Sequence, residues 1–298
     1  MRITIVVPSE EFLTAAGMRI RYARIMADQA DPDVRIAVRP IGDLLGAAEP
    51  DGDVFVFAKV YDARAAVLAH RLKRLGRIIG QDLFDDYFSQ AGDPRLARFR
   101  AAMADLGAAT DFAVCSTPAM ARVAAQCLPG VPVTVVGDPV DRFEPLRVAD
   151  IAARKLRRAQ AERRLSVVWF GMGDNPYFPV GLHDLVAFAG ELGRLRRAGF
   201  AVDLEILTNP RAMTREALGQ LRGLPVDWQL AAWSEAGEAA ALEQADVAFI
   251  PVGGQGFSIA KSLNRAISAL AGGCQLLAPG YPLYPRSRRF SLPAPEDL

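Results

Sequence analysis

The chain alternates short apolar runs with helical stretches, and this pattern occurs twice along its 298 residues. Most of the runs are continuous and rich in β-branched residues. Such runs are typical of parallel strands that helices cover on both faces, because both sides of each strand are then buried. The pattern predicts strands over residues 3–7, 34–38, 54–59, 77–81, 111–115 and 133–136, and again over 166–170, 202–207, 226–230, 247–252 and 275–278. We therefore predict an α/β fold with two parallel sheets.

The break between the two series divides the chain into domains. Residues 1–146 form a predicted N-terminal Rossmann-like domain on the acceptor side and 166–298 a C-terminal one, with the two facing a central cleft. Residues 147–165 are rich in arginine and alanine, and we interpret them as a helical linker. The alternative is a basic helix in peripheral contact with a membrane. No helix is evident after Gly280, so we expect a C-terminal domain that is either truncated or closed by an irregular tail.

One stretch of the second series has the features of a phosphate site. The apolar run 247–252 stops at glycines, which allow a close approach of the backbone to a ligand. Ser258 is a candidate N-cap for a helix over 259–271, whose polar face carries Lys261, Asn264 and Arg265. A glycine loop, a helix N-terminus and two cations together favour an anion. The alternative is a tight turn followed by an ordinary solvated helix.

Polar residues also follow the predicted strands of the first domain. Gly17, Arg19 and Arg21 lie where the loop after the first strand meets a helix, and Lys59 ends the third strand. Ligands of open α/β sheets bind beyond the strand C-termini, so these four are candidate substrate-binding residues. The alternative for the residues at the helix junction is ordinary solvation of the helix. The motif DLFDD, residues 82–86, follows the fourth strand, and its carboxylates suit either a general base, sugar hydroxyls or a helix cap.

Composition narrows the classes of function. The formal net charge of +1 gives no argument for nucleic-acid binding. Only two histidines are present, which disfavours a multi-histidine metal centre, and three scattered cysteines suit buried thiols of a cytoplasmic protein. The N-terminus has no signal-peptide layout, and no apolar window is long enough for a transmembrane helix.

Several segments resemble the GT-B fold of nucleotide-sugar glycosyltransferases. NRAISALAGGCQLLAPG is similar to the E-A-M-A-x-G-x-P-V-V-A segment of the large retaining family, and PVGGQGF to its P-S-x-x-E-G-F-G loop. VVWFGMGDN and GDPVDRF resemble the start of its C-terminal domain and the end of its N-terminal domain. The chain departs from the family at its two glutamates, where Gln255 and Ser268 stand instead. The sequence K-S-x-N-R at 261–265 resembles another branch of bacterial glycosyltransferase-like proteins.

The resemblance implies an enzyme that moves a sugar from a UDP-, GDP- or dTDP-sugar to a glycan or lipid-linked acceptor, in surface polysaccharide or glycoconjugate synthesis. It implies no bound metal and no tightly bound cofactor. Lys261 and Arg265 would neutralise the diphosphate leaving group, and Asp82 or Asp85 would face the acceptor. The remaining candidates for donor binding are Gly171, Gly173, Asn175, Asn209, Gly254, Gly256, Phe257, Ser258 and Asn264.

Two other functions remain open. A sugar-nucleotide epimerase on the same fold is one, although it needs more acid and base residues than this chain offers. The other is a non-catalytic binding or scaffold protein that kept the fold, which the absence of the glutamate pair favours. The sequence does not predict an oligomeric state.

Overall fold

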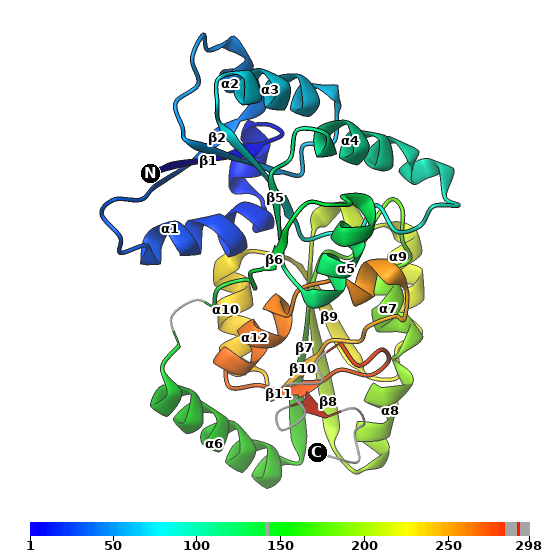
Figure 1. Cartoon of the computed structure of the whole chain (residues 1–298). Coiled ribbons are helices and arrows are strands. Elements are labelled where there is room, and N and C mark those ends of the chain that lie inside the picture. Colours follow the sequence, from blue (N-terminus) through cyan, green and yellow to red (C-terminus); the bar gives the residue numbers. More distant parts are fainter. Residues whose placement is uncertain (141–142, 284–290, 293–298) are drawn as a thin grey trace. The chain divides into compact units, whose positions relative to one another are not determined.

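A computed structural model describes residues 1–140, 143–283 and 291–292 of the chain (Figure 1). The chain forms two units. The first comprises Met1–Pro139 and the short segment Ala260–Ser262, and the second comprises Val140–Ile259 and Leu263–Leu298. The tail that we expected to be irregular lies largely in residues 284–290 and 293–298, outside the described residues. Within the described part, no helix is long and apolar enough to cross a membrane.

The first unit is built on a parallel sheet with the strand order β2-β1-β3-β4-β5-β6. Val6 on β1 packs into one hydrophobic core, and Ile5 and Val7 pack into the other. The strands are β1 Arg2–Val7, β2 Arg35–Pro40, β3 Val54–Ala58, β4 Ile78–Leu83, β5 Phe112–Cys115 and β6 Val133–Val135. The helical elements are η1 Glu10–Thr14, η2 Met18–Ala23, α1 Arg24–Asp28, α2 Ile41–Gly46, α3 Ala63–Arg74, η3 Pro94–Leu96, α4 Ala97–Gly107 and α5 Pro118–Cys127.

The second unit has its own parallel sheet, in the order β12-β11-β10-β7-β8-β9. On its strand β7, Val167 and Trp169 belong to one core, and Val168 and Phe170 to the other. The strands are β7 Arg164–Gly171, β8 Ala201–Thr208, β9 Asp227–Ala232, β10 Val247–Phe249, β11 Gln275–Leu277 and β12 Ser291–Leu292. The helical elements are α6 Pro145–Glu162, α7 Leu182–Ala187, α8 Gly190–Arg197, η4 Pro210–Ala212, α9 Arg215–Leu221, α10 Glu235–Gln244, α11 Gly256–Ile259 and α12 Asn264–Ala271. Both sheets are covered on two faces, as continuous apolar strands predict.

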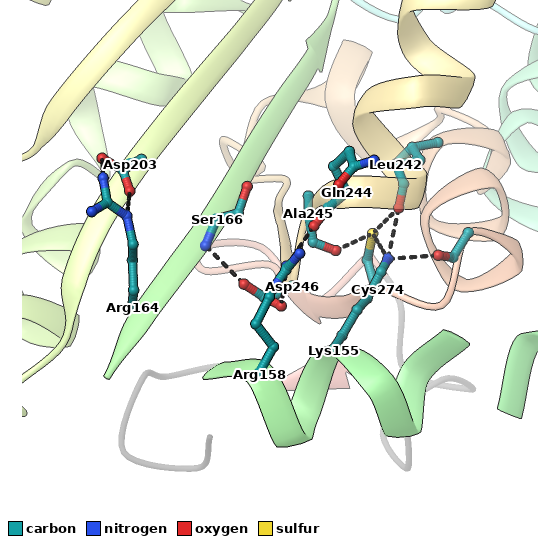
Figure 2. A network of polar contacts seen from close by, with 11 residues as sticks. Lys155, Arg158, Arg164, Ser166, Asp203, Leu242, Gln244, Ala245, Asp246 and Cys274 are labelled. Atoms are coloured by element: carbon teal, nitrogen blue, oxygen red, sulfur yellow. Dashed lines mark hydrogen bonds and ion pairs between the residues drawn. The ribbon is translucent and has the colours of Figure 1, made fainter. Parts of the chain in front are cut away.

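The predicted linker 147–165 is helical over most of its length, but its helix α6 groups with the second unit. The reason is Lys155, which is buried and whose Nζ donates hydrogen bonds of 2.7 Å to the carbonyl oxygens of Leu242 and Gly272 (Figure 2). These carbonyls lie at the C-terminal ends of α10 and α12, where no further helical N–H is available to them. A single ammonium group therefore fixes α6 to two other helices.

A second contact fixes α6 to the sheet. Asp246 precedes β10, and its carboxylate accepts a 2.8 Å hydrogen bond from the backbone N–H of Ser166 and a 2.7 Å bond from Arg158 Nη2. Arg164 pairs with Asp203 nearby (Figure 2). All these contacts lie at the amino ends of the strands, whereas ligands of such sheets bind at the carboxyl ends. We therefore interpret the network as structural.

The helix predicted over 259–271 is wrong in one respect, because it is two short helices with a break at residues 260–263. In a continuous helix the carbonyl oxygen of Ala260 would accept from the N–H of Asn264. It instead accepts a 2.9 Å hydrogen bond from the hydroxyl of Thr117, which belongs to the same unit as Ala260. Ser258 is accordingly a buried residue of α11 and not an N-cap, and Lys261 lies in the break.

Candidate functional site

The strand order of the second unit contains one topological switch point, which lies between β10 and β7. From β7, the chain adds β8 and β9 on one side and then β10, β11 and β12 on the other. The connections that leave the carboxyl ends of β7 and β10 therefore run towards opposite edges of the sheet. Open α/β sheets bind ligands in the crevice between two such connections. The predicted residue Gly171 ends β7 and Gly173 follows it, and Gly253 and Gly254 follow β10. Sequence-predicted donor residues thus converge on this topological switch point.

The loop after β7 requires its glycines. Gly171 has φ +148°, and Gly173 lies so close to its neighbours that a Cβ there would come within 2.5 Å of Thr208 Oγ1. The backbone N–H of Gly173 donates a 2.8 Å hydrogen bond to Asn209 Oδ1. At the far end of the loop, Gly181 has φ +79° and packs against the Gly173 carbonyl. The loop is therefore a tight, close-packed backbone turn at the end of the central strand.

Both predicted asparagines hold this loop in place. Asn209 Nδ2 donates a 2.9 Å hydrogen bond to Asp174, which also pairs with Arg211. Asn175 Oδ1 accepts from the backbone N–H groups of Tyr177 and Phe178, at 2.9 and 3.2 Å. Both side chains are thus engaged within the protein, and their contribution to a ligand site is to shape the loop.

The loop after β10 packs onto the first loop. Gln255 Nε2 donates a 3.1 Å hydrogen bond to the carbonyl oxygen of Pro179. Phe257 stacks on Phe178, with ring centroids 4.3 Å apart and planes inclined by 17°. A Cβ on Gly254 would meet no atom within 4 Å, so open space adjoins this residue. Gly256 is the first residue of α11.

Arg265 brings a cation to the two loops. Its Nη1 lies 3.5 Å from the carbonyl oxygen of Phe170 and next to Gly171, although α12 connects β10 to β11. In the part of the chain that the structure describes, no carboxylate forms an ion pair with Arg265. The neighbouring Asn264 begins α12, and its Oδ1 accepts a 2.7 Å bond from the Arg265 N–H. The half-buried guanidinium group is therefore placed to meet an anion at the switch point.

Asp184 is a further residue of this site that the sequence reading missed. It lies in the first turn of α7, its exposed fraction is 9%, and a Cβ on Gly253 would lie 2.9 Å from its Oδ1. Burial raises the pKa of Asp184, while the charge of Arg265 and, more weakly, His183 lowers it. The only sequence signal is an acid three residues after Gly181, in the first turn of a helix, and this is equally typical of a surface helix.

The sheet of the first unit also has a topological switch point, because β2 is added on one side of β1 and β3 on the other. Gly17 directly precedes η2, packed against the ring of Phe12, and Arg19 lies half-buried on η2. Lys59 directly follows β3 and has a left-handed backbone, with φ +56°. Such a conformation is uncommon for a residue with a side chain and occurs often at ligand sites.

Lys59 and Lys261 both contact Asp85. Lys59 Nζ lies 2.5 Å from one carboxylate oxygen, and Lys261 Nζ forms an ion pair with the other. Burial opposes ionisation of Asp85, but the two ammonium groups outweigh it and lower its pKa to about 2. Lys261 belongs with the first unit and Arg265 with the second. The structure therefore does not place the two predicted leaving-group cations on one helix turn.

Arg21 and Asp82 form a buried network. Asp82 lies within β4 and not in the loop after it, because β4 extends to Leu83. Asp82 Oδ2 accepts hydrogen bonds from Arg21 Nε at 2.6 Å and from the Tyr22 hydroxyl at 2.7 Å, and Arg21 also pairs with Asp138 at 2.7 Å. Arg21 is 3% exposed, and although burial opposes its charge, the two carboxylates raise its pKa. Asp82 Oδ1 is buried and has no hydrogen-bond partner among the described residues.

The described residues contain no group of three or more histidine, cysteine or acidic side chains arranged to hold a metal ion. No family model matches the chain, and no curated protein matches it.

Solved structures do resemble it. Trehalose-6-phosphate synthase OtsA matches with a TM-score of 0.60 at 12% identity, over 94% of this chain and 84% of that one. HepE from Anabaena, in complex with UDP and glucose, matches with a TM-score of 0.60 at 15% identity, over 94% and 80% of the two chains. An α,α-trehalose-phosphate synthase from Burkholderia vietnamiensis matches with a TM-score of 0.55 at 13% identity, over 94% and 84%. Identities this low show a shared fold alone, so the chain has an α/β fold of the GT-B type, with two Rossmann-like units.

Proposed function

We propose that this protein is a glycosyltransferase that moves a sugar from a nucleoside diphosphate sugar to an acceptor. One observation carries the proposal. Two tight glycine loops and a cation without a carboxylate partner in the described residues meet at the switch point of the second unit, where open α/β sheets bind ligands. Backbone amides and an arginine suit a diphosphate. The structural neighbours support this choice, because one was solved with UDP and glucose and another with UDP-2-fluoro glucose.

In the proposed reaction, the bond between the sugar and the diphosphate breaks, and negative charge builds on the leaving diphosphate. Arg265 neutralises that charge, which is the largest demand of the reaction, and the protein needs no metal ion for this task. Lys261, the other predicted cation, is held by Asp85 in the first unit, and we retain it as a second candidate. We also retain Gly254, Gly256, Phe257, Ser258 and Asn264 as residues that shape the donor site.

We assign acceptor binding to the first unit. Lys59 follows β3, and Arg19 lies in the connection after β1, the two strands at the switch point of this sheet. Both residues are therefore candidates for contact with a glycan or lipid-linked acceptor. Asp85 is a weak candidate for a general base, since its low pKa leaves it with little affinity for a proton. Asp82 has one oxygen without a partner in the described residues, but it is buried. The proposed context is surface polysaccharide or glycoconjugate synthesis in the cytoplasm.

The test is titration calorimetry of the full chain with UDP-, GDP- and dTDP-sugars, followed by mass-spectrometric detection of transfer to sugar and lipid-linked acceptors. We expect one nucleotide to bind and its sugar to be transferred. Binding without transfer to any acceptor supports a non-catalytic binding protein, which Gln255 and Ser268 in place of glutamates favour. A donor whose sugar changes configuration without an acceptor supports an epimerase. If a folded protein binds no nucleotide sugar, the proposal is wrong.

A further inference from the structure

The first unit holds two lysines on a single buried acid, beyond the carboxyl end of its sheet. Asp85 is 4% exposed and lies just after β4, and Lys59 directly follows the neighbouring strand β3. Lys59 Nζ lies 2.5 Å from Asp85 Oδ2, and Lys261 Nζ forms an ion pair with Asp85 Oδ1. Because the two oxygens belong to one carboxylate, the two ammonium groups lie next to each other.

This pair carries more positive charge than its acid neutralises. Two ammonium groups on one carboxylate leave one positive charge, and the side chains of Lys59 and Lys261 remain 30% and 39% exposed. The two other acids of the motif DLFDD are engaged elsewhere. Asp82 accepts hydrogen bonds from Arg21, and Asp86 accepts them from backbone N–H groups of its own loop. The lysine pair is therefore a half-exposed positive site that favours an anion.

Lys59 is held in place from two sides. Its backbone has φ +56°, a conformation that is uncommon for a residue with a side chain and that occurs often at ligand sites. Its Nζ also lies 4.6 Å from the centroid of the Phe84 ring. A Cβ on Gly17, which directly precedes η2, would lie 3.6 Å from an atom of the same ring. The loops after β1, β3 and β4 thus meet at Phe84, beside the switch point where such sheets bind ligands.

Thr117 fixes the segment that carries the second lysine. Its hydroxyl donates a 2.9 Å hydrogen bond to the carbonyl oxygen of Ala260, the residue directly before Lys261. The same oxygen accepts a 3.0 Å bond from the N–H of Met120 as the N-cap of α5, so its orientation is set from both directions. Thr117 is 8% exposed. It acts on Lys261 through the backbone and is therefore a positioning residue.

Resting on the proposed function, which assigns the acceptor to this unit, we propose that Lys59 and Lys261 bind a negatively charged group of the acceptor. Asp85 holds the two ammonium groups together, and Thr117 positions Lys261 for this contact. The group is a phosphate ester or a carboxylate, since both offer oxygens that accept from two ammonium groups. Lys261, a second candidate for the donor diphosphate, then serves the acceptor, and Arg265 serves the donor.

The first test is calorimetry of the full chain with inorganic phosphate, glucose 6-phosphate, glucuronate and glucose. Phosphate also suits the proposed donor site, so Arg265→Ala is the reference protein. We expect it to bind phosphate and one of the two charged sugars, and glucose at least about tenfold more weakly. Adding Lys59→Gln should weaken anion binding by about tenfold or more, and adding Lys73→Gln, an exposed lysine paired with Asp111, by less than about twofold. The charged sugar that binds identifies the group. No anion binding, or binding that Lys59→Gln leaves intact, overturns the inference.

The second test separates positioning from structure. Thr117→Val keeps the shape of the side chain and loses the hydroxyl, whereas Thr117→Ser keeps the hydroxyl. We expect Thr117→Val to weaken anion binding by about fivefold or more, Thr117→Ser to restore it, and both to bind the nucleotide sugar as the wild type does. Equal anion affinity of the two folded variants contradicts the role of Thr117. Weaker donor binding with intact anion binding in Lys261→Gln returns Lys261 to the donor and overturns the inference. If the anion binds and no nucleotide sugar does, the proposed function fails and the anion site stands.

Discussion

The guanidinium group of Arg265 lies 3.5 Å from the carbonyl oxygen of Phe170, so a side chain from the β10–β11 connection reaches the carboxyl end of β7. Phe170 is the next-to-last residue of the strand on one side of the switch point, and α12 follows the strand on the other side. One side chain thus spans the two strands between which the fold predicts a ligand.

The first prediction concerns the loop after β7. Gly173→Ala places a Cβ 2.5 Å from Thr208 Oγ1 and 2.7 Å from Ala212 Cβ, distances at which the neighbours have to move. We expect it to lower the free energy of unfolding by about 1–3 kcal/mol, measured by urea denaturation. The matched control is Gly219→Ala in α9, where a Cβ meets nothing within 4 Å. That change should be neutral or stabilise by up to about 1 kcal/mol, and equal losses in both variants contradict the packing argument.

The second prediction concerns the helix that we had interpreted as a linker. Lys155→Met leaves the carbonyl oxygens of Leu242 and Gly272 without their buried donor. We expect a loss of about 1–3 kcal/mol in the free energy of unfolding. Arg157→Met on the exposed side of the same helix should change it by less than about 0.5 kcal/mol. If α6 were an independent linker, the two substitutions would have similar small effects.

Most strands could be predicted because their apolar runs are buried on both faces, a property that depends on local sequence. The break before α12 could not, because its cause is a hydroxyl 143 residues away that takes the Ala260 carbonyl. Local propensity alone favours a continuous helix there, which is why Lys261 was placed beside Arg265. Asp184 was missed for a related reason. Its burial and its closeness to Gly253 arise only when β10 docks beside β7.

A third prediction follows from the pKa of Asp85, which lies at about 2 in the folded protein against 3.8 for an unperturbed group. Because the folded value is the lower one, the group stabilises the fold above about pH 4, and this contribution is lost as pH falls towards 2. The difference corresponds to about 2 kcal/mol. Lys59→Met removes one of the two ammonium groups, so its acid unfolding midpoint should lie at higher pH. Circular dichroism during acid titration measures it, and an unchanged midpoint contradicts the assignment.

A fourth prediction concerns the departure from the glutamate of the resembling family. Gln255→Glu cannot donate to the Pro179 carbonyl, and it adds negative charge beside the proposed diphosphate. We expect weaker donor binding and a loss of about 1 kcal/mol in stability, followed by calorimetry and thermal unfolding. Gln220→Glu, exposed on α9, is the control for added charge. Tighter binding by Gln255→Glu than by the wild type would show that a carboxylate belongs at this position.

The central claim is that a donor diphosphate binds at Arg265. The most direct measurement is the dissociation constant of the bound nucleotide sugar for the wild type, Arg265→Ala and Arg164→Ala. Arg164 lies at the opposite, amino end of β7 and forms an exposed ion pair with Asp203, so its removal tests the general loss of a positive charge. The account predicts that Arg265→Ala weakens binding by about tenfold or more and that Arg164→Ala leaves it within about twofold. Equal affinity of Arg265→Ala and the wild type, in a folded protein, would contradict the account.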